Sequence, residues 1–246
     1  MADSRRVAAL VEYDGTDYSG WQSQTHSASI QDAIQDAISF VAGERITAVC
    51  AGRTDRGVHA IGQVIHFDTS AMRTPRAWVL GANTRLPPAI SLQWAGAVET
   101  GFHARHAATR RVYRYFILNR SARSGLQRAR AAWVHRALDA DAMHAAAQAL
   151  LGEHDFSAFR SVECQSKTPV RRVAAWRAWN PDSTSPAHCS EIAGGSLVFA
   201  PRTQARGVRT AFVSKWMTWP IACTPRSVRP AQIVTTLWPA TKEIAS

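Results

Sequence analysis

A carboxylate stands between two arginines in the segment CAGRTDRGVHA, residues 50 to 60. Asp55 is flanked by Arg53 and Arg56, and the segment follows a short apolar run and contains two glycines. A nearby guanidinium favours the ionised carboxylate, which suits a nucleophile or a general base better than a general acid. The same three residues could form a structural clamp that holds a turn. Chemistry alone leaves both interpretations open.

Other kinds of site fit this segment less well. Gly52 and Gly57 have the spacing of a phosphate-binding P-loop, but Val58 and His59 replace the lysine and hydroxyl residue that this loop requires. Asp55 and His59 could be two metal ligands, yet no third ligand lies near them in sequence. The four cysteines form no CxxC pair, so we expect plain thiols. We therefore expect no metal and no cofactor.

The charge of the chain indicates a polyanionic partner. Lysine and arginine total 29 against 18 acidic residues, a net charge of +11. Only three are lysines, which leaves 29 − 3 = 26 arginines. Arginine binds phosphate bidentately and stacks on bases, so this balance favours a nucleic acid, although an arginine-rich coding bias would give the same composition. The sequence contains neither a transmembrane stretch nor a signal-peptide core, so we expect a cytoplasmic protein without membrane contact.

Strands and helices alternate along the first two thirds of the chain. Apolar residues recur at helical spacing from Ile30 to Val41, with Ser29 or Ser27 as the N-cap and Gly43 as the C-cap. Thr74 and Pro75 predict the start of a helix that ends near residue 84, and Asp139 predicts another that Gly152 ends. The predicted strands are Arg5–Glu12, Ile46–Cys50, Ala60–Asp68, Ser91–Val98 and Arg111–Leu118. Together these elements predict a sheet covered by helices.

The composition changes after about residue 173. The last 73 residues hold 7 of the 11 prolines and 5 of the 9 tryptophans, but only 3 of the 18 acidic residues. Dense proline interrupts helices and sheet ladders, so we expect only short strands there, such as Ser196–Ala200.

The central segment resembles the tRNA pseudouridine synthase A family, whose hallmark is GRTD-x-GVH. Here it is Gly52 to His59, with Arg56 in place of the usual small residue. Other stretches resemble the family in the same order, over roughly residues 5 to 173. They are Tyr13-Asp14-Gly15, Gly20-Trp21-Gln22, Ser29-Ile30-Gln31, Gly62-Gln63-Val64, His66-Phe67, Phe102-His103-Ala104-Arg105, Arg110 to Tyr115, Gly152 to Phe156, and Lys167-Thr168-Pro169.

The resemblance implies an α+β fold of two sub-domains, each a β-sheet covered by helices on one face, with a cleft between them. The first would span residues 5–105 and carry the catalytic aspartate. The second would span residues 106–246, family-like only to about 173 and irregular or incomplete beyond it. The family is homodimeric, which would hold here too.

The resemblance also implies an activity, that of a cofactor-free isomerase that converts uridine to pseudouridine in the anticodon stem-loop of tRNA. Asp55 resembles the catalytic nucleophile, Arg53 its ion-pair partner, and Tyr113 the aromatic residue that stacks on the target base. The expected RNA contacts are Arg56, Arg105, Arg110, Arg111 and Arg114. His59, His66 and His103 are expected to be structural or tRNA-facing rather than catalytic.

One family feature is missing from the sequence. The C-terminal half of the family carries a Phe-x-His-His-Met-Val-Arg-like stretch, and no two histidines are adjacent anywhere in this chain. We interpret the loss and the change in composition as a shift of reading frame near residues 173 to 180, with true divergence as the alternative. A remnant that binds RNA without catalysing the reaction is therefore the second functional hypothesis.

Overall fold

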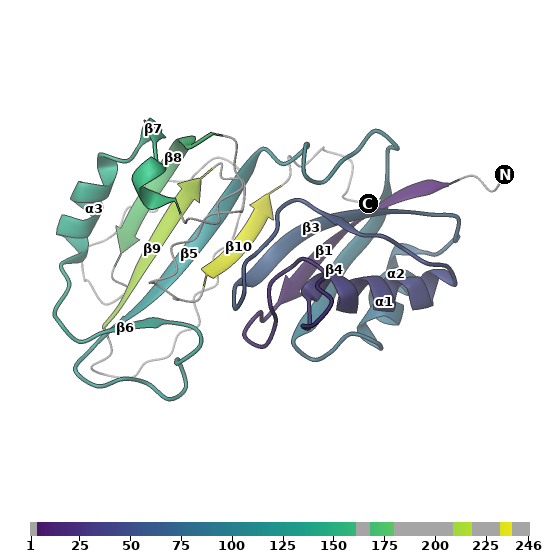
Figure 1. The fold of residues 1–246 in the computed structure, drawn as a ribbon, viewed down its shortest axis with the longest axis horizontal. Coiled ribbons are helices and arrows are strands. Elements are labelled where there is room, and N and C mark those ends of the chain that lie inside the picture. The colour runs from purple at the N-terminus through teal and green to yellow at the C-terminus, as the bar shows by residue number, and fades with distance from the viewer. Residues whose placement is uncertain (1–3, 161–167, 180–208, 218–231, 238–246) are drawn as a thin grey trace.

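The computed structural model describes residues 4–160, 168–179, 209–217 and 232–237 (Figure 1). Ten strands form one mixed, mainly antiparallel sheet, with helices packed against it. The strands are β1 (Arg5–Tyr13), β2 (Val49–Cys50), β3 (His59–Thr69), β4 (Ile90–Val98), β5 (Arg110–Asn119), β6 (Ala132–Val134), β7 (Gly152–Asp155), β8 (Val170–Trp179), β9 (Arg209–Met217) and β10 (Gln232–Leu237). The helices are α1 (Ile30–Ala42), α2 (Pro75–Asn83) and α3 (Ala140–Gln148), followed by a short 3₁₀ turn, Ser157–Phe159.

The sheet runs without a break from one half of the molecule to the other. Its order is β4-β1-β3-β10-β5-β9-β8-β7, with β2 paired to β3 and β6 paired to β5. The strand β10 joins the halves, because it pairs in parallel with β3 and antiparallel with β5. Figure 1 shows α1 and α2 beside the β1, β3 and β4 strands, and α3 at the opposite end beside β8. The expected α+β fold is confirmed, whereas the boundary between residues 105 and 106 stays a prediction.

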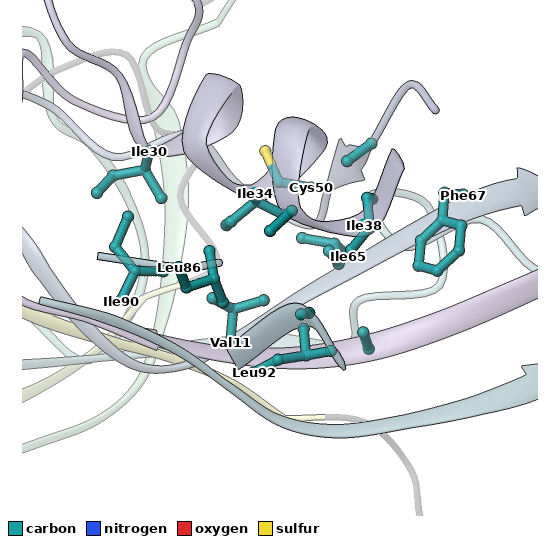
Figure 2. Close-up of a cluster of buried hydrophobic side chains, with 14 of the residues drawn as sticks. Val11, Ile30, Ile34, Ile38, Cys50, Ile65, Phe67, Leu86, Ile90 and Leu92 are labelled. Carbon is teal, nitrogen blue, oxygen red and sulfur yellow. The ribbon is translucent and has the colours of Figure 1, made fainter. Parts of the chain in front are cut away.

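Helix α1 forms where its apolar spacing predicts and provides much of the core. Ser29 caps it by accepting a hydrogen bond from the Asp32 amide, and Gly43 ends it with a left-handed φ of 76°. Ile30, Ile34 and Ile38 are fully buried and face Val11, Ile65, Phe67 and Leu92 of the sheet (Figure 2). Burial of these apolar side chains fixes the strands on either side of the loop that carries Asp55.

The predicted strand Ile46–Cys50 is shorter than expected. The Ile46 amide donates to Ser39 Oγ at 2.9 Å, and the Ala48 amide donates to Gln35 Oε1 at 3.0 Å. Side chains of α1 therefore satisfy backbone groups that a longer strand would have paired with β3. The other four predicted strands agree with the structure to within one residue at each end.

The two later helices begin at the predicted caps, and α2 ends close to the predicted position. Thr74 accepts a hydrogen bond from the Ala77 amide, with Pro75 as the first residue of α2. Asp139 accepts hydrogen bonds from the Asp141 and Ala142 amides at the start of α3. This helix ends at Gln148 rather than at Gly152. Gly152 has a φ of 94° and is instead the first residue of β7. Gly152 was therefore wrongly assigned as the helix end.

Long strands after residue 169 were not predicted from the sequence. Three described strands, β8, β9 and β10, enter the sheet, and two of them flank β5. Their apolar alternation is weak, so their hydrogen-bond partners, rather than a local pattern, identify them. The predicted strand Ser196–Ala200 and three of the cysteines lie outside the described residues, while Cys50 is a buried free thiol. No helix in the described ranges is long and apolar enough to cross a bilayer.

Candidate active site

The loop that carries Asp55 begins at the end of β2. Its first two residues are held by hydrogen bonds to β3. The Ala51 amide donates to the Val64 carbonyl at 2.8 Å. The Gln63 side chain has no exposed surface and bonds both backbone groups of Gly52: its Oε1 accepts from the Gly52 amide, and its Nε2 donates to the Gly52 carbonyl. A buried amide paired in this way holds the first turn of the loop in one position.

The residue before Asp55 is fixed from the other side. The Tyr13 hydroxyl lies 2.8 Å from Thr54 Oγ1, in a buried hydrogen bond, and the Trp21 amide donates to the Thr54 carbonyl at 2.9 Å. The Gly20 backbone touches the same carbonyl, because a Cβ built on Gly20 would lie 2.6 Å from it. The segment Tyr13–Trp21 therefore packs directly against the loop, and any side chain at Gly20 would push the two apart.

The far end of the loop turns sharply after Asp55. The Val58 amide donates to the Asp55 carbonyl at 3.1 Å, and Gly57 has a left-handed φ of 79°. The Gly57 amide also donates to the Tyr18 carbonyl at 3.3 Å. The half-buried Asp55 side chain is thus held on a backbone that is bonded immediately before and after it.

The structure brings Tyr113 of β5 to this loop. Burial raises the pKa of the Tyr113 hydroxyl well above its usual value; the Arg111 guanidinium opposes this rise, and Tyr115 and the Asp55 carboxylate add to it. An electrostatic effect between Asp55 and Tyr113 requires the two side chains to be close. Two residues 58 positions apart in sequence are therefore within electrostatic range of each other. Tyr113 also packs against the apolar cluster that contains Tyr13 and Val58.

Arg111 connects the same strand to the start of the loop. Its Nη2 donates to the Ala51 carbonyl at 2.8 Å, from a half-buried position. Because side chains alternate along a strand, Arg111 shares one face of β5 with Tyr113, while Arg110 and Arg114 point to the other face. Burial lowers the pKa of Arg114, which is partly withdrawn from solvent. The three predicted RNA contacts on β5 therefore do not form one cluster.

The remaining predicted arginines are exposed around the loop. Burial raises the pKa of the Cys50 thiol to about 12, and the nearby guanidinium groups of Arg53 and Arg105 oppose that rise. Both arginines therefore lie near Cys50, at the end of β2. Arg56 is exposed at the turn itself.

His59 has contacts on both ring nitrogens, as expected for a structural residue. Its Nδ1 lies 2.9 Å from Asp14 Oδ1 and 3.1 Å from the Gly15 amide, and its Nε2 lies 3.2 Å from the Ala129 carbonyl. Arg130 Nη2 lies 3.0 Å from the other Asp14 oxygen. The residues after the turn are thereby joined to a segment of the second half of the chain.

Sequence reasoning assigned no role to Tyr13 or Gln63, although both lie in the stretches that resemble the family. The signal for Gln63 was an amide within a run of buried strand residues, since such a group needs a buried partner. Tertiary packing determines the position of Tyr13, and it also determines which carbonyls Arg111 and Trp21 bond. No local sequence pattern predicts such packing.

Known proteins match the chain over most of the described region. A family model described as tRNA pseudouridine synthase matches residues 9–106 and 146–194. A tRNA pseudouridine synthase A of Shewanella sp. (strain MR-4) is 54% identical over 168 residues, which cover 68% of this chain and 64% of the relative. Proteins of the same description from Shewanella baltica (strain OS185) and Shewanella sp. (strain ANA-3) are 54% and 52% identical over the same shares. The match thus spans less than two thirds of these relatives, and the family model extends it past residue 173.

Proposed function

Because this chain belongs to the tRNA pseudouridine synthase family, we propose that it isomerises uridine to pseudouridine in tRNA. The observation that carries the proposal is that Tyr113 packs against the apolar cluster that contains Tyr13 and Val58, within electrostatic range of Asp55, while buried hydrogen bonds hold the Asp55 loop in place. An aromatic ring near a carboxylate suits this reaction. The ring can receive a uracil that has left its stack, and the carboxylate can attack a carbon of the sugar.

The reaction needs no oxidant and no second substrate. The C1′–N1 bond of uridine breaks, a C1′–C5 bond forms, C5 loses its proton to solvent and N1 gains one. Asp55 acts as the nucleophile that assists detachment of the uracil, through a covalent adduct or through elimination to a glycal. Arg53 is the ion-pair partner that keeps Asp55 ionised, and Tyr113 stacks on the uracil ring.

The exposed arginines provide the RNA contacts in this proposal. Arg56 and Arg105 are exposed near the loop, where each can meet a phosphate. Arg111, Arg110 and Arg114 complete the proposed set, with Arg111 also bonded to the Ala51 carbonyl. The proposal includes a target uridine on the 3′ side of the anticodon stem-loop, a homodimeric protein and a cytoplasmic location.

Tritium release tests the activity and the role of Asp55 together. The substrate is a tRNA transcript labelled with tritium at C5 of uracil, because that atom is lost only when C5 bonds to the sugar. We expect release by the wild-type chain and a loss of at least about 10⁴-fold for Asp55→Ala, since removal of a nucleophile abolishes the covalent route. Asp55→Asn, which keeps the shape of the side chain, should be equally inactive.

The matched control is Asp36→Asn, which removes an exposed carboxylate from α1. It should retain wild-type release, and all three variants should bind tRNA. Release that persists in Asp55→Ala would contradict the assignment of the nucleophile. A wild-type chain that binds tRNA and releases no tritium would instead support the second hypothesis, an RNA-binding remnant.

A further inference from the structure

A strongly basic segment follows β5, includes the short strand β6, and extends beyond the end of the sheet (Figure 1). We call residues 120–136 the arginine-rich segment. It contains five arginines and no acidic residue. Arg123, Arg128 and Arg136 are exposed, and among the residues that the structure describes none pairs with their guanidinium groups. Such uncompensated charge attracts a polyanion.

The segment is held in shape by its own hydrogen bonds. Arg120 donates to the carbonyls of Ala122 and Arg123 at 2.6 and 3.0 Å, and the Trp133 indole donates to the Arg120 carbonyl at 3.0 Å. At its base, the Asn119 side chain bonds the backbone of Val134, Arg136 and Leu138. The exposed arginines are therefore carried on an ordered frame, which reduces the entropy lost when they bind.

Two contacts attach this frame to the candidate active site. The Ala129 carbonyl lies 3.2 Å from His59 Nε2, and Arg130 Nη2 lies 3.0 Å from Asp14 Oδ2. His59 begins β3 directly after the loop of Asp55, so the arginine-rich segment is bonded to the backbone that follows the nucleophile. A polyanion on its surface would also be close to the catalytic loop.

We propose that the arginine-rich segment binds the sugar-phosphate backbone of the RNA substrate outside the catalytic loop, with Arg123 and Arg128 each contacting a phosphate. This inference rests on the proposed function for the identity of the substrate. Planar guanidinium groups suit phosphate oxygens, and the half-exposed Trp133, whose ring centroid lies 5.9 Å from that of His135, offers an adjacent aromatic surface. Contacts of this kind fix the position of the RNA without reading its sequence.

The test measures binding of an unmodified tRNA transcript by fluorescence anisotropy over a range of salt concentrations. The test variant is Arg123→Gln with Arg128→Gln in the full chain, and Arg123→Glu with Arg128→Glu is a stronger second variant. We expect Kd to rise about tenfold at 0.1 M salt and the slope of log K against log salt to fall by about 2, one for each phosphate contact. Charge reversal should increase the loss further.

The matched control is Arg45→Gln with Arg76→Gln, which removes two exposed arginines, one from the loop after α1 and one from α2. It should keep the wild-type Kd, and thermal unfolding should show that every variant folds. A test pair with the Kd and salt slope of the control pair would overturn the proposal. The proposal would also be overturned if the test pair bound tRNA like the wild-type chain but no longer bound vesicles of phosphatidylcholine and phosphatidylserine. The partner of the segment would then be a lipid surface.

Tritium release by the same preparations separates this proposal from the proposed function. If the wild-type chain binds tRNA through the segment and releases no tritium, the segment is confirmed and the activity fails. If it releases tritium and the test pair binds like the control pair, the activity stands and the segment fails. If the wild-type chain binds no tRNA, both proposals are wrong.

Discussion

Residues 5–105 form the first region of the sheet, and the described residues that follow them form the second. The two regions differ in how many apolar side chains they bury. In the first region α1 and α2 pack on β1, β3 and β4 over a continuous apolar cluster (Figure 2). In the second region the described core is small: Phe156 and Val173 are buried, and Leu150, Leu151, Trp176 and Tyr113 pack partly against them. Helix α1 buries five residues, whereas α3 buries only Ala147.

The difference shows which region positions the chemistry. The loop around Asp55 is bonded to Tyr13, Trp21 and Gln63, through the Thr54 hydroxyl in the first case and through the backbone in the other two, and all three belong to the well-packed region. The second region contributes Tyr113 and Arg111 from β5, the strand that β10 joins to β3. We infer that the first region provides most of the bonds that hold the loop, and that the second adds the Arg111 bond to Ala51 together with the Tyr113 side chain and charge.

The largest contrast should appear in matched core deletions. Leu92 is 1% exposed within the large cluster, whereas Leu150 is only partly buried against Phe156. Leu92→Ala should lower the free energy of unfolding by about 3 kcal/mol and Leu150→Ala by about 1 kcal/mol, because the cavity and the lost apolar contact are larger at Leu92. Urea unfolding of both variants measures the difference.

Equal losses for the two variants would mean that the second region is as well packed as the first. Tryptophan fluorescence reports on both regions together, because Trp21 and Trp78 lie in the first and Trp133 and Trp176 in the second. A single transition in all variants would show that β10 couples the regions into one cooperative unit.

A smaller effect is expected from matched glycine substitutions. Gly20 and Gly152 both have left-handed φ values, 100° and 94°. A Cβ at Gly20 would lie 2.6 Å from the Thr54 carbonyl, while a Cβ at Gly152 would lie 3.8 Å from its nearest neighbour, His154 Nε2. Gly20→Ala should therefore displace the loop and lower kcat/KM about 100-fold, or about 2.7 kcal/mol, in the tritium assay.

Gly152→Ala is the control for backbone strain alone. It should cost about 1 kcal/mol of stability through its φ angle and leave kcat/KM within about twofold of wild type. If Gly20→Ala is as active as Gly152→Ala, close packing of segment 13–21 does not position Asp55.

The sequence predicted those features of the fold that depend on local pattern. Ser29, Thr74 and Asp139 begin their helices as capping residues, and alternation identified β5, where Val112 and Leu118 are buried on one face. The candidate nucleophile could be proposed because an aspartate between arginines stood in a motif that resembles a known family. Each of these signals lies within about a dozen neighbouring residues.

Features that depend on distant partners could not be predicted. The β2 strand is short because Ser39 and Gln35 of α1 take its hydrogen bonds. The assignment of Arg111 as an RNA contact did not anticipate its bond to the Ala51 carbonyl, 60 positions away. The shift of reading frame stays a prediction, which sequencing of the gene past codon 173 can test.

The smallest effect concerns the pH dependence of the first region. His66 of β3 is 4% exposed, and burial, together with His103 and Arg6, lowers its pKa from 6.5 to about 4. Since the unfolded chain binds this proton more tightly than the folded chain, the neutral ring stabilises the fold above about pH 6.5, and that contribution is lost as the pH falls. Between pH 7 and pH 5 the loss should be about 1–2 kcal/mol.

Urea unfolding at both pH values compares the wild-type chain with His66→Gln, whose amide can still accept the hydrogen bond from the Ala104 amide. The variant should lose about 1–2 kcal/mol less on acidification, because no ring remains to be protonated. The matched control is His135→Gln, at an exposed position in the second region. If His66→Gln loses as much stability as the control, the buried ring is not what makes the well-packed region sensitive to acid.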